Sequence, residues 1–502
     1  MPETAQYVDP RRWKALIFIA LAQLMVVLDA TIVNIALPSA QTDLNISDGN
    51  KQWVITAYAL AFGGLLLFGG RLADLWGRKQ TFVVGLVGFA AASALGGAAL
   101  NSSMLLGARA LQGVFGALLA PSALSLLAVT FTDAKERAKA FGVFGAIAGG
   151  GGAVGLILGG VLTEYMDWRW TFFVNIPFAI VAAAGAIAVI REPVESRNPS
   201  RLDIPGVLLA TSGLVSLVYG FTRAESDGWT AGWTIGLFVA AAVLLTAFAV
   251  VESRVKAPLL PLRVVTNRNR GGVYASLGLA VIGMFGLFLF LTYYMQVVKG
   301  YSPVKTGLAF LPMIAGMITG STQIGARLMT RVPARLLMGP GFLAAAAGML
   351  LLTQLDLDTS YPALILPAFL LLGLGMGTAF MPAMSLATHG VQPRDAGVAS
   401  AMVNTSQQVG GAIGTALLNT IAASASTEYA KSHALAAPSR KALELQSMVH
   451  GYTTAIWWAV GILTLAATIA ITLINSGGKG SGGTVAGSGE GAVEDAVPVM
   501  AH

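Results

Sequence analysis

Cysteine is absent from this chain of 502 residues, which excludes disulfides, thiolate metal sites and cysteine nucleophiles without fixing the redox compartment. Only four histidines are present, so we expect no metal site. Charged residues are also scarce, at 11% against about 25% in soluble domains. Most of the surface therefore does not meet water. A soluble enzyme and a nucleic-acid binder are excluded despite the net charge of +7.

Apolar residues, by contrast, make up 55% of the chain. Since a spanning helix needs about 20 of them, this is enough for about fourteen spans. Sixty glycines against eleven tyrosines favour closely packed helices over an aromatic-rich barrel. The sequence predicts an all-α membrane protein with fourteen transmembrane helices. The apolar segments lie at 15–38, 52–70, 80–100, 103–130, 138–163, 170–190, 204–222, 233–251, 271–298, 306–329, 336–354, 361–388, 397–424 and 451–475.

The basic residues divide unequally between the two sides of such a bundle. With a cytoplasmic N-terminus, 22 of the 31 Lys and Arg fall in cytoplasmic segments and 8 in outer loops, while Arg109 lies within a span. The positive-inside rule then places both termini in the cytoplasm. We expect no cleavable signal peptide, because the first span is too long. The tail after Ser476 is rich in Gly and Ser, and we expect it to be disordered.

The chain also contains an internal repeat. Gly116 and Pro121 of the fourth span have the same spacing as Gly377 and Pro382 of the twelfth. We therefore predict two six-helix halves, a plan of many secondary transporters with the site between the halves. The predicted parts are an N-terminal half (12–190), a linker with two extra helices (191–270), a C-terminal half (271–475) and a cytoplasmic tail (476–502). No nucleotide-binding loop occurs, so we expect no cofactor.

Several stretches together resemble one family. LDATIVNIALP (28–38), GRLADLWGRK (70–79) and the segment 105–113 resemble motifs of the fourteen-span drug:proton antiporters of the major facilitator superfamily. WRWTFFVNIP (168–177), GYSPVKTG (300–307) and AGVASAMVNTSQQVGGAIG (396–414) are similar to further stretches of that family. The resemblance covers about residues 12 to 475. It implies the major facilitator fold, with two six-helix halves and two inserted helices.

The family's antiporter motif on the fifth span is matched incompletely. The matching residues are Gly142, Gly151, Gly155, Gly159 and Gly160. Leu156 stands where the family has proline, which would remove a backbone hydrogen bond and kink the helix. We expect Gly151, Gly155 and Gly159, spaced four residues apart, to keep their role in close helix packing.

Asp29 is the main candidate for chemistry. It lies nine residues before Pro38, about 13 Å below the outer end of its span. An acid at such a depth is costly and marks an ion or substrate path. The alternative is a permanent salt bridge, for which Arg109 on the fourth span is the natural partner. The resemblance favours a role in proton coupling, and the two interpretations coexist if protonation breaks the pair.

Other polar residues within spans are candidates for lining a substrate cavity. They are Asn34, Gln112, Gln296, Asn404 and Gln408. Such side chains either line a cavity or join neighbouring helices, and the sequence leaves both alternatives open.

The loop after the second span is a candidate gate. The resemblance assigns this role to Gly70, Asp74, Gly77 and Arg78, with the aspartate engaging the opposite half. The positive end of the thirteenth helix is a physical reason for that contact. We expect Glu164, near an outer loop, to be solvated.

Together these features predict a proton-driven antiporter that exports lipophilic or amphipathic drugs across the plasma membrane. Its expected partners are a small-molecule substrate, protons and the lipid bilayer, with no nucleic acid, and we expect a monomer. A dedicated exporter of one endogenous metabolite would use the same scaffold. A nutrient importer is disfavoured, because the first span has no stretch that resembles the Glu-x-x-Glu-Arg signature of proton-coupled peptide importers. A membrane sensor is disfavoured too, because it would need a large soluble domain, and the Gly- and Ser-rich tail is the only segment of note outside the predicted spans.

Overall fold

The computed structural model describes residues 11–47, 49–131, 134–190, 203–255, 258–260, 262–329, 331–388, 396–434 and 439–475, and every regular element in these ranges is a helix. The first part of the chain forms α1 (Arg12–Asp43), α2 (Trp53–Trp76), α3 (Arg78–Gly97), α4 (Ser102–Thr130), α5 (Ala134–Tyr165), α6 (Trp170–Phe173) and α7 (Asn175–Val189). A hairpin of α8 (Ile204–Asp227) and α9 (Gly232–Arg254) follows.

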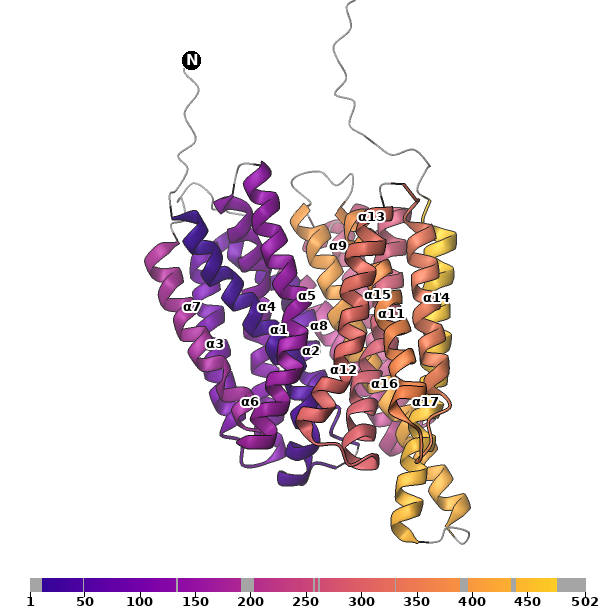
Figure 1. The fold of residues 1–502 in the computed structure, drawn as a ribbon. Helices are drawn as coiled ribbons and strands as arrows, with labels where there is room; N and C mark the ends of the chain where they lie inside the picture. The colour runs from indigo at the N-terminus through magenta and orange to yellow at the C-terminus, as the bar shows by residue number, and fades with distance from the viewer. Residues whose placement is uncertain are drawn as a thin grey trace, which may run out of the picture.

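The second part begins with α10 (Leu262–Val265) and α11 (Arg268–Tyr293), which continues into the π-helix η2 (Tyr294–Val298). It goes on with α12 (Pro303–Thr319), η3 (Gly320–Gly325), α13 (Ala326–Leu328), α14 (Arg335–Leu352), η4 (Tyr361–Ile365), α15 (Leu366–Thr388), α16 (Ala396–His433) and α17 (Arg440–Leu473). The start of α1 and the end of α17 lie at the same end of the bundle (Figure 1). We call this the terminal end and the opposite one the distal end.

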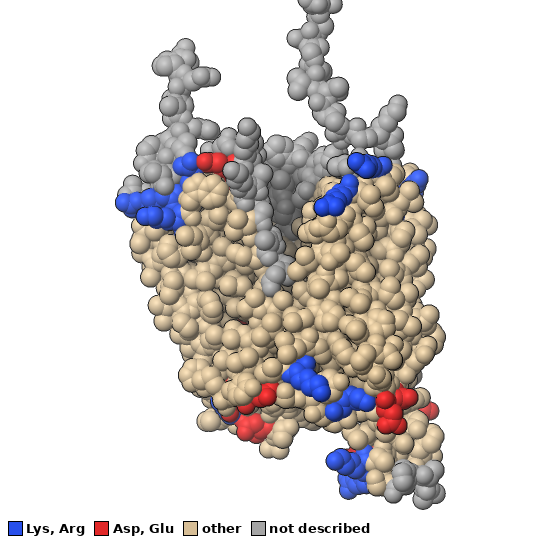
Figure 2. Space-filling view, viewed as in Figure 1, with Lys and Arg blue, Asp and Glu red and all other residues tan. Residues whose placement is uncertain are grey.

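Twelve helices of the described chain are long and apolar enough to cross a membrane. Two shorter apolar stretches, Trp53–Leu66 and Gly151–Tyr165, lie on α2 and α5. Each of the fourteen apolar segments of the sequence thus corresponds to a helix or a run of adjoining helices. On the face shown in Figure 2, charged side chains gather at the two ends and leave a broad uncharged band between them.

The helices of the second part repeat the packing of the first. In the first part α1 contacts α5 and α7, while α4 contacts α2 and α3. In the second part α11 contacts α16 and α17, while α15 contacts α12 and α14. The two parts meet where α5 packs against α12 and α2 against α16. This is the arrangement that a duplicated six-helix unit produces; the residue boundaries given above for the halves stay a prediction.

Glycines allow equivalent helix pairs to approach closely in both parts. A β-carbon at Gly69 of α2 would overlap the carbonyl oxygen of Ala117 on α4. In the second part, a β-carbon at Gly377 of α15 would overlap the carbonyl oxygen of Met317 on α12. Small residues at such crossings bring helix backbones into direct contact, which favours association within a bilayer.

Candidate functional site

A buried ion pair joins α1 to α4. Arg109 Nη1 lies 2.7 Å from Asp29 Oδ2, and the two residues are 1% and 0% exposed. The expected pairing of these residues is therefore present in the structure. The two residues are 80 positions apart in the sequence, and they meet because α1 and α4 pack against each other.

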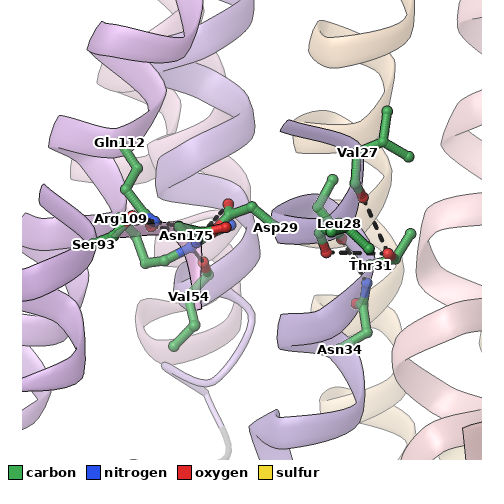
Figure 3. A network of polar contacts seen from close by, with 11 residues as sticks. Val27, Leu28, Asp29, Thr31, Asn34, Val54, Ser93, Arg109, Gln112 and Asn175 are labelled. Carbon is green, nitrogen blue, oxygen red and sulfur yellow. Dashed lines mark hydrogen bonds and ion pairs between the residues drawn. The ribbon is translucent and has the colours of Figure 1, made fainter. Parts of the chain in front are cut away.

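The second carboxylate oxygen of Asp29 is held by two side-chain amides. Oδ1 accepts hydrogen bonds from Gln112 Nε2 on α4 and from Asn175 Nδ2 at the start of α7, each at 2.9 Å. Ser93 Oγ on α3 accepts from the same two amides, at 2.8 and 3.4 Å. Figure 3 shows these side chains converging on Asp29 from several helices. Both carboxylate oxygens are thus satisfied inside the first six-helix part.

Arg109 has partners other than Asp29. Its Nε donates to the carbonyl oxygen of Val54 at 2.8 Å, and Nη1 donates to Gln112 Oε1 at 2.8 Å. The guanidinium also lies over the ring of Tyr58, 4.4 Å from its centroid. A cation buried in this way is stabilised by acceptors and by the face of an aromatic ring. The guanidinium therefore keeps hydrogen bonds even when Asp29 is neutral.

Two members of this network were not identified from the sequence. Ser93 and Asn175 are both fully buried. Asn175 lies within the stretch 168–177 that resembles a family motif, which was the available signal for it. Ser93 lies in a Gly- and Ala-rich span and carried no comparable signal. Gln112 lies within the network and is fully buried; of the two alternatives, lining a cavity or joining neighbouring helices, this structure shows the second.

The opposite face of α1 packs against α5. Thr31 points away from Asp29 in Figure 3, and its hydroxyl donates to the carbonyl oxygens of Val27 and Leu28. A β-carbon at Gly155 of α5 would overlap that hydroxyl. α1 therefore separates the charged network from the glycine-rich helix.

The other motif glycines of α5 divide between two neighbours. β-Carbons at Gly151 and Gly159 would crowd α1, whereas one at Gly160 would meet the backbone of Val304 on α12. The surroundings of Gly142 lie outside the described part of the structure. Leu156 is buried in α5, which has no proline between Ala134 and Tyr165. The close packing expected from glycine is thus present without the family's proline.

The remaining cavity candidates have different positions. Asn34 is buried and its side-chain amide donates to the carbonyl oxygen of Ala30 on the same helix, at 3.0 Å. Gln296 lies in η2 and its amide donates across the two parts to the carbonyl oxygen of Ile35, at 3.1 Å. Gln296 therefore joins helices in this structure.

Asn404 and Gln408 lie on α16 and are half-buried. Gln408 faces α2: a β-carbon at Gly63 would lie 2.8 Å from its Cβ. Asn404 lies one turn nearer the terminal end of the same helix, and the spacing of four residues puts it on the same face as Gln408. These two residues remain candidates for lining a substrate cavity, at the interface between α2 and α16.

Hydrogen bonds connect the two parts near the distal end, and we call this set the distal clamp. Its bonds are Tyr293 Oη to Gln41 Oε1, Gln296 Nε2 to the Ile35 carbonyl oxygen, Asn419 Nδ2 to Gln52 Oε1 (3.0 Å) and the Val304 amide to Glu164 Oε2 (3.0 Å). Lys51 adds a cation–π contact, 4.2 Å from the centroid of the Tyr293 ring. The bundle is therefore closed at this end. Glu164 is exposed, as expected, and it also accepts a hydrogen bond from the first turn of α12.

The predicted gate lies at the terminal end, between α2 and α3. Gly77 is the residue between these helices, and its φ of 106° favours glycine. A β-carbon at Gly70 would lie 3.5 Å from Pro121, in ordinary contact. Arg78 begins α3 and is half-buried. The side chain of Asp74 and those of residues 396–401 lie outside the described part, so their contact stays a prediction.

Comparison with known proteins agrees with this architecture. The family described as Major Facilitator Superfamily matches residues 19–415, and the chain belongs to that superfamily. A curated relative is the puromycin resistance protein pur8 of Streptomyces alboniger, 54% identical over 470 residues, which cover 93% of this chain and 92% of that protein. The cephamycin export protein CmcT of Amycolatopsis lactamdurans is 38% identical over 414 residues, covering 82% and 85% of the two chains.

Solved structures show the same fold at low sequence identity. A bacterial homolog of the human lysosomal transporter Spinster, inward-facing and occupied, has a TM-score of 0.67 and 15% identity, covering 92% of this chain and 96% of that one. The peptide transporter PepTSo has a TM-score of 0.66 and 17% identity, covering 91% and 96%. With the superfamily match and the curated relatives, this identifies the chain as a multi-pass helical membrane transporter for small molecules.

Proposed function

We propose that this protein is a proton-driven antiporter that exports an antibiotic-like compound from the cell. The relatives named for puromycin resistance and cephamycin export support the direction and the class of substrate. The observation that carries the coupling mechanism is the hydrogen bonding of Arg109 to acceptors besides Asp29. Because of these acceptors, Asp29 can become neutral while the buried guanidinium keeps hydrogen bonds. A buried guanidinium without partners would cost several kcal/mol.

The network is connected to the distal clamp through the start of α2. Arg109 binds the carbonyl oxygen of Val54, and two residues earlier Gln52 binds Asn419 of the opposite part. Protonation of Asp29 removes its attraction for Arg109 and leaves the guanidinium to Val54 and Gln112. We infer that this redistribution changes the position of the start of α2, and with it the stability of the distal clamp.

The orientation of the protein in the membrane determines on which side each step of the transport cycle takes place. We propose a plasma-membrane location with the terminal end in the cytoplasm, as the distribution of basic residues favours. The structure then corresponds to a state closed to the outside, in which the substrate enters from the cytoplasm or the inner leaflet. Opening of the distal clamp releases the substrate and lets a proton reach Asp29. We propose that the monomer works without a bound cofactor, driven by the proton gradient.

The test is transport by purified protein in liposomes under an imposed pH gradient, with puromycin as the first substrate. Asp29→Asn removes the titratable group and should abolish gradient-driven export, while substrate binding and downhill exchange remain. Asp167→Asn is the matched control, because this acid is exposed in a distal loop and about half of its side chain meets solvent (47%). The control should transport like the unmodified protein.

A purely structural role for Asp29 predicts a different pattern. Asp29→Asn would then destabilise the protein by leaving Arg109 with one acceptor fewer, and Arg109→Gln in the same chain would restore folding. Gradient-driven export by that double variant would refute the proton role. Proteoliposomes that export neither puromycin nor any of the antibiotics tested would instead contradict the proposed substrate class.

A further inference from the structure

Two buried acidic residues meet at the terminal end of the α8–α9 hairpin, far from Asp29 in sequence. Asp203 is the residue that caps the start of α8, and Glu252 lies in the last turn of α9. They are only 4% and 3% exposed. Carboxylic acids buried to this degree are uncommon unless they are paired with a cation or hold a proton.

Each carboxyl group has one oxygen bound to the backbone. Asp203 Oδ1 accepts from the amide of Gly206, and Glu252 Oε2 accepts from the amide of Leu260, both at 2.9 Å. The other two oxygens, Asp203 Oδ2 and Glu252 Oε1, are buried and have no hydrogen-bond partner. Two unsatisfied buried acceptors therefore remain in this corner of the hairpin.

The unsatisfied oxygens converge on the same point. A β-carbon at Gly206 would lie 2.5 Å from Asp203 Oδ2 and 2.8 Å from Glu252 Oε1. Only a residue without a side chain leaves this space open between them. The two carboxyl groups thus face each other across the first turn of α8.

Three basic residues of the described chain lie on helices that hold or adjoin the pair, while Arg201 and Lys256, close to the pair in sequence, lie outside the described part. Arg254 on α9 and Arg263 on α10 are exposed, and Arg71 on α2, which packs against α8, is half-buried. Within the described part of the chain, neither Arg254 nor Arg71 forms an ion pair with Asp203 or Glu252. The side chains at the start of α16, which also packs against α8, lie outside the described part.

We propose that Asp203 and Glu252 form a proton-binding site that holds one proton between their two unsatisfied oxygens. Two ionised carboxylates in this position would repel each other in a medium of low dielectric. A shared proton removes one charge and makes one oxygen a donor to the other, as in paired carboxylates of other proteins. Both orphan acceptors are then satisfied.

The site ties three segments together. Asp203 fixes the start of α8, and Glu252 fixes both the end of α9 and the segment around Leu260 that leads to α11. Loss of the shared proton leaves two negative charges among these segments and loosens them. The site thus responds to pH at the terminal end and is independent of Asp29.

The experiment follows thermal unfolding of the purified full-length protein by its tryptophan fluorescence between about pH 5 and 9. The folded pair holds a proton at pH values where the separate carboxyl groups of the unfolded chain, with pKa values of about 3.9 and 4.3, have lost theirs. The stability that this proton supplies is therefore fully present at low pH. While the folded pair holds one proton more than the unfolded chain, the folding constant falls about tenfold per pH unit, and it levels off once the shared proton has left.

Glu252→Gln should remove this dependence and retain stability at high pH, because the amide donates permanently to Asp203. Asp203→Asn should do the same while keeping the helix cap. Glu444→Gln is the control, since 63% of that side chain is exposed, and its pH dependence should match the unmodified protein. Infrared spectra should show a protonated carboxyl band that Glu252→Gln and Asp203→Asn each remove.

Two results would overturn the proposal. One is a pH dependence and a carboxyl band that both persist in Glu252→Gln. The other is stabilisation of the unmodified protein at high pH by Mg²⁺ or Ca²⁺ that is lost in Glu252→Gln, which would identify a site for a divalent cation instead of a proton.

Discussion

The hydrogen bond between Gln52 and Asn419 offers a direct measure of the distal clamp. Both side chains are buried, at 0% and 3% exposure, and the bond crosses from the start of α2 to α16. Gln52 Nε2 already has no hydrogen-bond partner. Asn419→Ala would therefore leave the whole amide of Gln52 without a partner while the clamp is closed.

The size of the effect follows from the burial. An unsatisfied buried polar group costs about 1–3 kcal/mol. Opening of the clamp exposes Gln52 to water, so the cost falls on the closed state alone. We expect Asn419→Ala to shift the equilibrium toward the open state by roughly 5- to 150-fold, since about 1.4 kcal/mol corresponds to a factor of ten.

The absence of native cysteine makes the measurement clean. A single cysteine at Asn404, between the two parts, should react with a membrane-impermeant maleimide added on the distal side faster in Asn419→Ala. The control is Thr427→Ala, also on α16, whose hydroxyl is exposed and bonds only to Ala423 of its own helix. Adding Gln52→Ala to Asn419→Ala should reverse part of the shift, because the unpaired amide is removed. Equal labelling in Asn419→Ala and Thr427→Ala would refute this account of the clamp.

Two further predictions concern packing and orientation. Gly159→Leu should separate α5 from α1 and lower both thermal stability and transport. Gly236→Leu on α9, where a β-carbon meets open space, should change neither. Equal loss in both variants would exclude the contact with α1 as the cause. Cysteines introduced singly at Asn267 and Ser432, both exposed, should be labelled from the cytoplasm and from outside respectively. Labelling of both from one side would contradict the proposed topology.

The sequence alone was sufficient for the class of fold, because the bilayer acts on composition and on the length of apolar runs. An uncharged stretch of about 20 residues must form a helix there, since each backbone group needs an internal partner. The equal spacing of Gly116 and Pro121, and of Gly377 and Pro382, predicted a repeat whose packing the structure shows. Asp29 and Arg109 were found for the same reason: charges within apolar spans are few and attract each other.

The tertiary structure decided which partner each polar side chain has. Asn175 binds Asp29 because α7 packs beside α1, and Ser93 accepts from Gln112 and Asn175 because α3 packs against α4 and α7. The residue types do not predict these contacts. Gln296 was a candidate either for lining a cavity or for joining helices, and in the structure its amide donates to the carbonyl oxygen of Ile35 on α1. Asp203 and Glu252 were not identified from the sequence, because they are 49 residues apart and meet over Gly206 only in the folded hairpin. Such contacts depend on helix rotation and depth, which a one-dimensional pattern of polarity does not contain.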